Sequence, residues 1–232
     1  PGLARLAGLI NSGPTRKAKS LLGTLALDPD EAFFITNSFF RRDVWNDLVT
    51  GELKRETQGY DPADITRAHY KNADTDDHLS SILYTDIKTY LPGDILVKVD
   101  RMSMANSLET RAPLLDYRVV EYAAQIPAAL KLYGKEKKYI LKKAFERMLP
   151  EDILYRKKMG FSVPLAHWLR HELRPTVEQF LLSSNSGVAN FFEPAGIRNL
   201  WQRHLAGDDQ FTQELWSLLA FELWWQQYQV SA

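Results

Sequence analysis

Two short stretches of this sequence combine charged and small residues in patterns that could support chemistry. The first is residues 98–116, where charged side chains stand among small and apolar ones. The charges that border the predicted helix here are on Lys98, Asp100, Arg101, Glu109 and Arg111. Charged groups near an apolar core need ionic partners or a ligand. The stretch therefore predicts either a ligand site or a structural role, in which Glu109, Arg111 and Asp116 pair and cap the next helix.

The second stretch is Tyr155–Pro164, Y-R-K-K-M-G-F-S-V-P, a short basic turn between two predicted helices. Gly160 provides a pivot and Phe161 an aromatic anchor. One interpretation is a solvated basic turn, and the other is a lysine aimed at a phosphate group, which an ammonium binds as a point charge. The residues alone leave both interpretations open.

Other groupings of polar residues favour structural roles. His167 and His171 stand four apart on a predicted helix, but no third ligand is in register, which favours partly exposed histidines over a metal site. The acids at 74–77 resemble the start of a calcium loop, yet Leu79 stands where such a loop needs glycine, so a helix N-terminus explains them better. The lysines at 135–143 are typical of a solvated helix face. We predict no metal site.

Helical periodicity predicts the elements that must position both stretches. Apolar spacing indicates a helix over 77–91 that stops at Pro92–Gly93, and a second helix with Asp94 as its N-cap. A third opens near Asp116 and ends at Pro127. Further helices are expected at 139–148, from 149, at 163–182 with a break near Pro175, at 195–205 and at 210–227. No segment alternates as a strand does, so the fold is expected to be mainly α-helical.

Composition excludes several classes of function. The 232 residues include 29 Lys and Arg and 29 Asp and Glu, and this net charge of zero provides no field to draw the chain to nucleic acid or an anionic membrane. The lack of cysteine excludes disulfides, cysteine-bound zinc and thiol nucleophiles, and it is compatible with a cytoplasmic location. No apolar run approaches the roughly 18 residues of a membrane span. We therefore expect neither nucleic-acid nor membrane partners.

Four sequence blocks follow one another in a fixed order. They are L-P-G-D-I-L-V-K-V-D-R-M-S-M-A from Leu91, S-L-E-T-R-A-P-L-L-D from Ser107, K-K-Y-I-L-K-K-A from Lys137 and L-P-E-D-I-L-Y-R-K-K-M-G-F-S-V-P from Leu149, with Trp168–Leu169 after them. Together they resemble the C-terminal part of the synthetase domain of the glutamine-hydrolysing asparagine synthetase (asparagine synthase) family. The similarity is strongest over 91–169.

The resemblance implies a fold and a reaction. The fold is the helical C-terminal portion of a pyrophosphatase-type, adenine nucleotide α-hydrolase-like α/β synthetase domain, with most of the parallel sheet missing. In this family ATP, held with Mg²⁺, adenylates the side-chain carboxylate of aspartate and releases pyrophosphate. Ammonia from a glutaminase domain then attacks the acyl-adenylate, which gives asparagine and AMP.

The resemblance also implies roles for individual residues. Lys158 matches the cation that stabilises negative charge on the α-phosphate and the leaving pyrophosphate. Asp100 matches an acid that arranges the substrates and assists proton removal from the incoming amine. Glu109 and Arg111 are expected to hold the helix of Asp100, and two further residues, Arg156 and Gly160, to shape the Lys158 loop.

The departures from the family pattern define what else is expected. The chain has no cysteine for a glutaminase, and it contains neither an S-G-G-x-D-S phosphate loop nor a G-x-G-x-D-E-type acidic loop. We therefore interpret residues 1–232, which begin with Pro1 rather than methionine, as the C-terminal portion of a synthetase-type domain without its glutaminase domain. By itself this portion is expected to be inactive and to bind no cofactor tightly. Its expected partners are ATP, aspartate and ammonia in the full-length enzyme, and a homodimer is compatible with the sequence.

Two alternatives remain at this point. Relatives on the same scaffold close β-lactam rings or amidate other carboxylates, so the substrate could differ. A second alternative is a non-catalytic helical interaction module, because residues 211–225 are apolar on nearly every face and include Trp216, Trp224 and Trp225. Such a helix is either central to a core or covers a partner domain.

Overall fold

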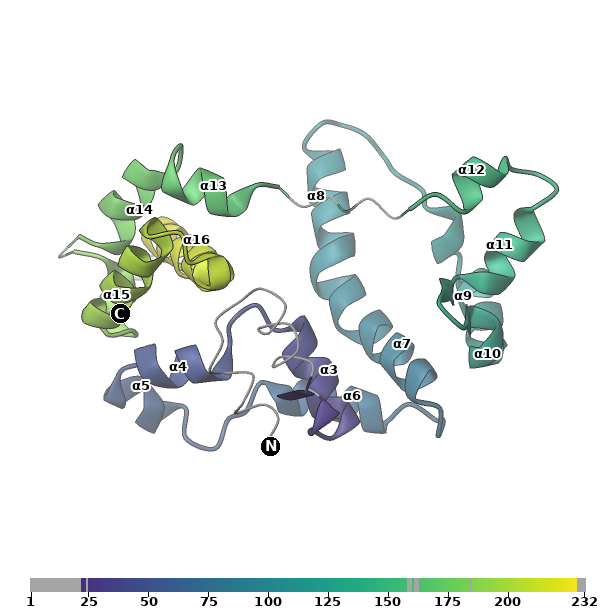
Figure 1. The fold of residues 1–232 in the computed structure, drawn as a ribbon, viewed down its shortest axis with the longest axis horizontal. Coiled ribbons are helices and arrows are strands. Elements are labelled where there is room, and N and C mark those ends of the chain that lie inside the picture. Colours follow the sequence, from purple (N-terminus) through teal and green to yellow (C-terminus); the bar gives the residue numbers. More distant parts are fainter. Residues whose placement is uncertain (1–21, 24, 158–159, 161–162, 184, 229–232) are drawn as a thin grey trace. The chain divides into compact units, whose positions relative to one another are not determined.

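The computed structural model describes residues 22–23, 25–157, 160, 163–183 and 185–228, and this part of the chain is mainly helical, as predicted (Figure 1). It divides into two compact units. The first unit comprises residues 1–34 and 62–159, and the second comprises 35–61 and 160–232. The division falls within α3 (Pro29–Asn37).

The first unit is built from short helices and one small hairpin. Its elements after α3 are α6 (Ala63–Lys71), α7 (His78–Lys88), η1 (Leu91–Leu96), α8 (Val97–Met104), η2 (Pro113–Leu115), α9 (Tyr117–Gln125), α10 (Ala128–Lys131), β1 (Leu132–Tyr133), β2 (Glu136–Lys137), α11 (Tyr139–Phe145) and α12 (Glu151–Leu154). The two strands pair antiparallel, with Leu132 opposite Lys137. Asp77 caps α7 by accepting a hydrogen bond from the Ser80 amide at 2.7 Å, which confirms the helix-terminus interpretation for this residue of the acidic cluster.

The predicted stop at Pro92–Gly93 is wrong. The chain continues from α7 through the π-helical turn η1 into α8, and Figure 1 shows these elements as one long bent rod. Proline removes one amide donor and crowds the preceding turn, and a widened π turn accommodates both effects. The Gly93 amide still bonds to the Thr89 carbonyl at 3.0 Å. Asp94 is therefore not an N-cap; it forms an ion pair with Lys98 at 3.1 Å, one turn later.

The second unit contains most of the buried apolar side chains. Its elements are α4 (Arg42–Leu48), α5 (Gly51–Glu56), α13 (Leu165–Arg170), α14 (Arg174–Leu181), η3 (Gly187–Asn190), α15 (Pro194–Leu205), η4 (Asp209–Phe211) and α16 (Thr212–Gln227). The break predicted near Pro175 falls at His171, and Pro175 instead lies in the first turn of α14, where a missing amide donor is tolerated.

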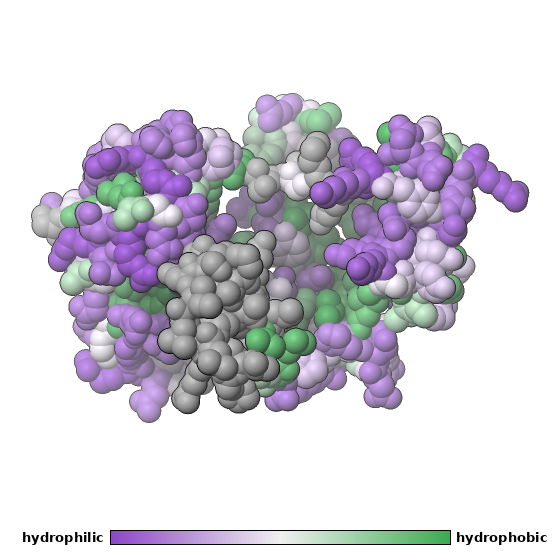
Figure 2. All heavy atoms as spheres, viewed as in Figure 1, coloured by the Kyte–Doolittle hydropathy of each residue, from purple (hydrophilic) through white to green (hydrophobic). Residues whose placement is uncertain are grey.

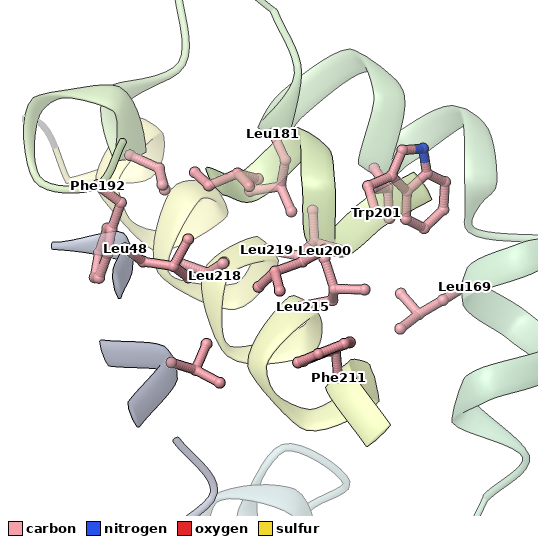
Figure 3. Close-up of a cluster of buried hydrophobic side chains, with 14 residues drawn as sticks. Leu48, Leu169, Leu181, Phe192, Leu200, Trp201, Phe211, Leu215, Leu218 and Leu219 are labelled. Atoms are coloured by element: carbon pink, nitrogen blue, oxygen red, sulfur yellow. The ribbon is translucent and has the colours of Figure 1, made fainter. Parts of the chain in front are cut away.

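The core of the second unit surrounds α16. Figure 3 shows its side chains converging on that helix: Leu48, Leu169, Leu181, Phe192, Leu200, Trp201, Phe211, Leu215, Leu218 and Leu219. Leu48 and Phe192 belong to segments far apart in sequence, which an isolated bridge between Val49 and Phe192 joins. Of the two roles predicted for the C-terminal helix, a central place in the core is confirmed.

The first unit differs sharply in its exposure. Among its described hydrophobic residues only Ala63 and Ala73 are buried. Large apolar side chains are exposed on α8 (Val99, Met102 and Met104) and on α9 (Tyr117, Val119 and Tyr122), and Figure 2 shows apolar residues at the surface among hydrophilic ones. Within the described residues no helix combines the length and apolarity that crossing a membrane requires.

Candidate functional site

Asp100 lies in the middle of α8, and its side chain is exposed. α8 begins directly after the π-helical turn η1, and such turns are frequent at functional sites. Lys98, two residues before Asp100, is paired with Asp94. Among the described residues no ion pair of Asp100 is present.

Glu109 and Arg111 pair with each other. The Arg111 Nε donates to Glu109 Oε1 at 2.7 Å, and both side chains are mostly exposed. No hydrogen bond or ion pair between this pair and Asp100 is recorded in the described part of the chain. Their predicted role in holding the helix of Asp100 therefore stays a prediction.

Asp116 performs the capping role that the sequence suggested for this stretch. Its carboxylate accepts a hydrogen bond from the Arg118 amide at 3.0 Å and so caps α9. It also accepts from Arg118 Nε at 2.9 Å, so its ionic partner is Arg118 rather than Arg111. The hydrogen bonds from Arg118 hold the pKa of the Asp116 carboxyl below its usual value. The structural role predicted for Asp116, capping the next helix, is thus confirmed, although its ionic partner is Arg118.

The basic turn is described only in part. Lys158, the predicted cation, lies outside the described residues. Arg156 and Lys157, which precede it in the first unit, are exposed, and Gly160 in the second unit is exposed as well. An open hollow in the surface is lined by Glu151, Asp152, Tyr155 and Arg156. No contact between Asp100 and Arg156 is recorded among the described residues.

A polar cluster at the base of this turn was not predicted from the sequence. Glu146, just after α11, accepts a hydrogen bond from Lys143 Nζ at 2.6 Å and another from the Tyr155 hydroxyl. Lys142 forms an ion pair with Glu136. Lys142 and Lys143 are therefore engaged by carboxylates. Lys135, Lys137 and Lys138 are exposed, in agreement with the solvated face that was predicted. In the sequence, the spacing of Lys143 and Glu146 indicates that these two side chains can interact. It does not reveal that the Tyr155 hydroxyl also donates to Glu146.

The groups in this cluster shift one another's pKa in the directions expected for ion pairs and hydrogen bonds. The Lys143 hydrogen bond, followed by that of Tyr155, lowers the pKa of the Glu146 carboxyl. The same contacts raise the pKa of the Lys143 ammonium and of the Tyr155 hydroxyl. Near neutral pH the carboxylate is therefore ionised and can only accept hydrogen bonds, so the Tyr155 hydroxyl donates.

The metal-site alternatives remain without support. The rings of His167 and His171 lie 4.2 Å apart between centroids, and His167 faces Glu172 at 3.6 Å. Within the described residues no group of three or more His, Asp or Glu side chains is arranged to hold a metal ion.

Comparison with known proteins places these features in a family context. Residues 14–226 match the family model described as Asparagine synthase. The chain is 32% identical over 208 residues to asparagine synthetase (glutamine-hydrolyzing) 1 of Bacillus subtilis (strain 168), a match that covers 90% of this chain and 32% of the relative. It is 35% identical over 186 residues to a putative asparagine synthetase (glutamine-hydrolyzing) of Mycobacterium tuberculosis (strain ATCC 25618 / H37Rv), covering 80% of this chain and 26% of the relative.

A protein that is named as an amidase is also similar to this chain. Amidase chyE of Penicillium rubens is 30% identical over 123 residues, which cover 50% of this chain and 18% of that protein. The chain thus spans a third or less of the length of these curated relatives. No solved structure gave a significant match.

Proposed function

Because the chain belongs to the asparagine synthase family, we propose that it is the C-terminal portion of an ATP-dependent ligase that converts aspartate to asparagine. The observation that carries the proposal is the family match over residues 14–226, which includes both Asp100 and Lys158. Two of the relatives are named as glutamine-hydrolyzing enzymes, which supports the proposal that the nitrogen source is ammonia released from glutamine.

In the proposed reaction an oxygen of the aspartate side-chain carboxylate attacks the α-phosphorus of ATP, and pyrophosphate leaves. Ammonia then attacks the acyl carbon, AMP leaves, and the amine loses a proton. We assign the Lys158 ammonium to the negative charge that develops on the phosphates. We assign Asp100 to arranging the substrates and receiving the amine proton. ATP and Mg²⁺ would be held mainly by parts of the family domain that this chain does not contain.

The exposure of the first unit supports this assignment. A unit that buries only Ala63 and Ala73 among its described hydrophobic residues has little core of its own. Exposed Met104 lies four residues from Asp100 on α8 and so on the same face of the helix, and a partner segment that covered this surface would also approach the proposed site. We propose that the remaining part of the synthetase domain provides this partner surface.

The test is aspartate-dependent exchange of labelled pyrophosphate into ATP, which reports adenylation directly. It uses the complete polypeptide that carries this sequence, as the wild type and as Lys158→Ala. We expect exchange in the wild type and a loss of at least roughly a hundredfold in the variant, because a fixed charge opposite a transition-state anion is removed. Lys157→Ala, the adjacent lysine of the same turn, is the matched control and is expected to retain exchange.

Each outcome distinguishes the candidate functions. Equal losses in Lys157→Ala and Lys158→Ala would contradict the specific role of Lys158. Exchange with another carboxylate but not with aspartate would favour a related ligase, a candidate supported by the similarity to a protein named an amidase. No exchange with any carboxylate would favour a non-catalytic helical module. In that case Lys158→Ala and Asp100→Asn would leave the parent protein's function intact.

A further inference from the structure

Ser107 has a backbone conformation that serine seldom adopts. Its φ is +56°, in the left-handed region where a Cβ atom crowds the neighbouring carbonyl oxygen. Glycine is the usual residue in this conformation, because it has no Cβ. Ser107 is exposed, and among the residues that the structure describes its hydroxyl has no hydrogen-bond partner. No contact of the side chain therefore compensates for the backbone strain.

Ser107 closes a Schellman motif at the end of α8. The Ser107 amide donates to the Met104 carbonyl at 2.9 Å, and the Leu108 amide donates to the Ser103 carbonyl at 2.9 Å. This pair of hydrogen bonds forms when the residue that follows the helix is left-handed. The conformation of Ser107 therefore sets both the end of α8 and the direction in which the chain leaves it.

The motif connects Asp100 with the Glu109–Arg111 pair. Ser103 Oγ donates to the Asp100 carbonyl at 3.0 Å, and the Ser103 carbonyl in turn accepts from the Leu108 amide. Glu109 follows Leu108 directly, and its Oε1 accepts from Arg111 Nε at 2.7 Å. Hydrogen bonds between described residues thus lead from the backbone of Asp100 to the residue that precedes Glu109.

We propose that Ser107 is a positioning residue for the ligase reaction, and that its left-handed conformation fixes where Glu109 and Arg111 stand relative to Asp100. This inference rests on the proposed function. Glu109 is two residues beyond Ser107, at most about 7 Å of extended chain, so a change of φ at Ser107 displaces it with little slack. Strained residues cluster at functional sites, where a fixed geometry outweighs their cost in stability.

Lys138 provides a matched comparison for a purely structural role. It is the other non-glycine residue with positive φ among the described residues, at +57°, and it is exposed at the start of α11 in the same unit. Valine, with its branched Cβ, opposes the left-handed conformation at both positions. Ser107→Val and Lys138→Val should therefore lower the melting temperature by similar amounts, and a structural role predicts similar effects on activity.

The experiment measures aspartate-dependent pyrophosphate exchange by the complete polypeptide, well below its melting temperature. For Ser107→Val we expect kcat to fall at least roughly tenfold, because transfer reactions lose rate steeply when a group is misplaced by about 1 Å. For Lys138→Val we expect kcat within about twofold of the wild type. Ser107→Asn should also retain kcat within about twofold, since asparagine tolerates the left-handed conformation.

Two milder variants separate the backbone of Ser107 from its hydroxyl. Ser107→Ala removes the hydroxyl without branching Cβ, and it should retain wild-type exchange. Ser107→Thr keeps the hydroxyl but branches Cβ, and its kcat should fall at least about threefold. If Ser107 acts through the Glu109–Arg111 pair, combining Ser107→Val with Arg111→Ala should give exchange no slower than that of the slower single variant.

The outcomes separate this inference from the function on which it rests. Equal losses of exchange in Ser107→Val and Lys138→Val would overturn the inference, since the role would then be structural. A loss in Ser107→Ala that Ser107→Thr does not share would overturn it in favour of the hydroxyl. Wild-type exchange in Ser107→Val beside an inactive Lys158→Ala would overturn it and leave the ligase assignment standing. No exchange in the wild type would overturn both.

Discussion

Buried polar side chains in the second unit show how single residues shape its stability. His204 on α15 is fully buried and stacks on Trp201, with its Nε2 3.3 Å from the Ala166 carbonyl. Its Nδ1 is buried, and among the described residues it has no hydrogen-bond partner. Burial, aided by the nearby Arg170 charge, lowers the pKa of His204 below its ordinary value of 6.5. The folded chain therefore holds this histidine neutral.

This arrangement predicts a loss of stability in mild acid. Below about pH 6.5 the unfolded chain binds a proton at this histidine that the folded chain does not, so the free energy of unfolding must fall as the pH falls. Urea unfolding of the wild type at pH 7.5 and pH 5.5 measures the effect. His204→Gln, which keeps a polar side chain but cannot titrate, should lose part of this pH dependence. An unchanged pH dependence in that variant would contradict the assignment.

The buried carboxylate of Glu222 joins two helical elements, η3 and α16. Glu222 accepts hydrogen bonds from Ser186 Oγ at 3.0 Å, from the Gly187 amide at 3.1 Å and from the Val188 amide at 2.7 Å. The fit is close, because a Cβ at Gly187 would lie 2.0 Å from Trp225 Cδ1. The carboxylate satisfies the free amides at the start of η3, which would otherwise be buried without partners.

Replacing this carboxylate should be costly. Glu222→Ala leaves two buried amides without acceptors, and we expect a loss of about 3 kcal/mol in the free energy of unfolding. Glu178→Ala on α14 is the matched control. Glu178 forms an exposed ion pair with Arg174, so this substitution should cost less than about 1 kcal/mol. Equal losses in urea titrations of the two variants would show that burial of Glu222 is not what matters.

The two faces of α16 differ in burial, which allows the stability contributions of two leucines on one helix to be compared. Leu215 is fully buried, whereas Leu223 on the same helix is 42% exposed. Leu215→Ala should cost about 2–5 kcal/mol, because it removes apolar contacts and leaves a cavity, while Leu223→Ala should cost less than about 1.5 kcal/mol. Chemical denaturation measures both values, and similar losses would contradict the place of α16 in the core.

For the whole molecule, the distribution of apolar surface is the main feature. The second unit has a packed core around α16, whereas the first exposes large apolar side chains on α8 and α9. Apolar surface of this extent on a separate chain favours association. We expect it to be covered when the unit is joined to the rest of the proposed synthetase domain.

The tendency of this apolar surface to associate can be tested on the chain by itself. Replacing three exposed apolar residues, Met102, Val119 and Tyr122, by lysine should reduce hydrophobic-dye binding and self-association, because each change removes apolar surface without opening a cavity. The melting temperature should stay within a few degrees of the wild type. Dye fluorescence and sedimentation measure the two properties, and a large drop in melting temperature would show that these side chains support a core.

The sequence by itself determined the local features of this protein. Helical periodicity predicted the mainly helical class, acids before helices predicted the caps at Asp77 and Asp116, and the ordered blocks around Asp100 and Lys158 indicated the family that the comparisons confirm. Such features depend on neighbours within one or two helical turns, which the sequence shows directly.

Only the tertiary structure decided the features that depend on distant residues. Pro92 was expected to end a helix, but a π turn accommodated it, since tertiary context overrides a local preference. Glu222 and His204 are of residue types that are seldom fully buried, yet packing encloses both. The Tyr155–Glu146 contact joins the ends of two helices, and no spacing rule predicts such a pair. The physical reason is that burial and long-range contacts depend on which elements pack together, and that choice is made by the whole chain.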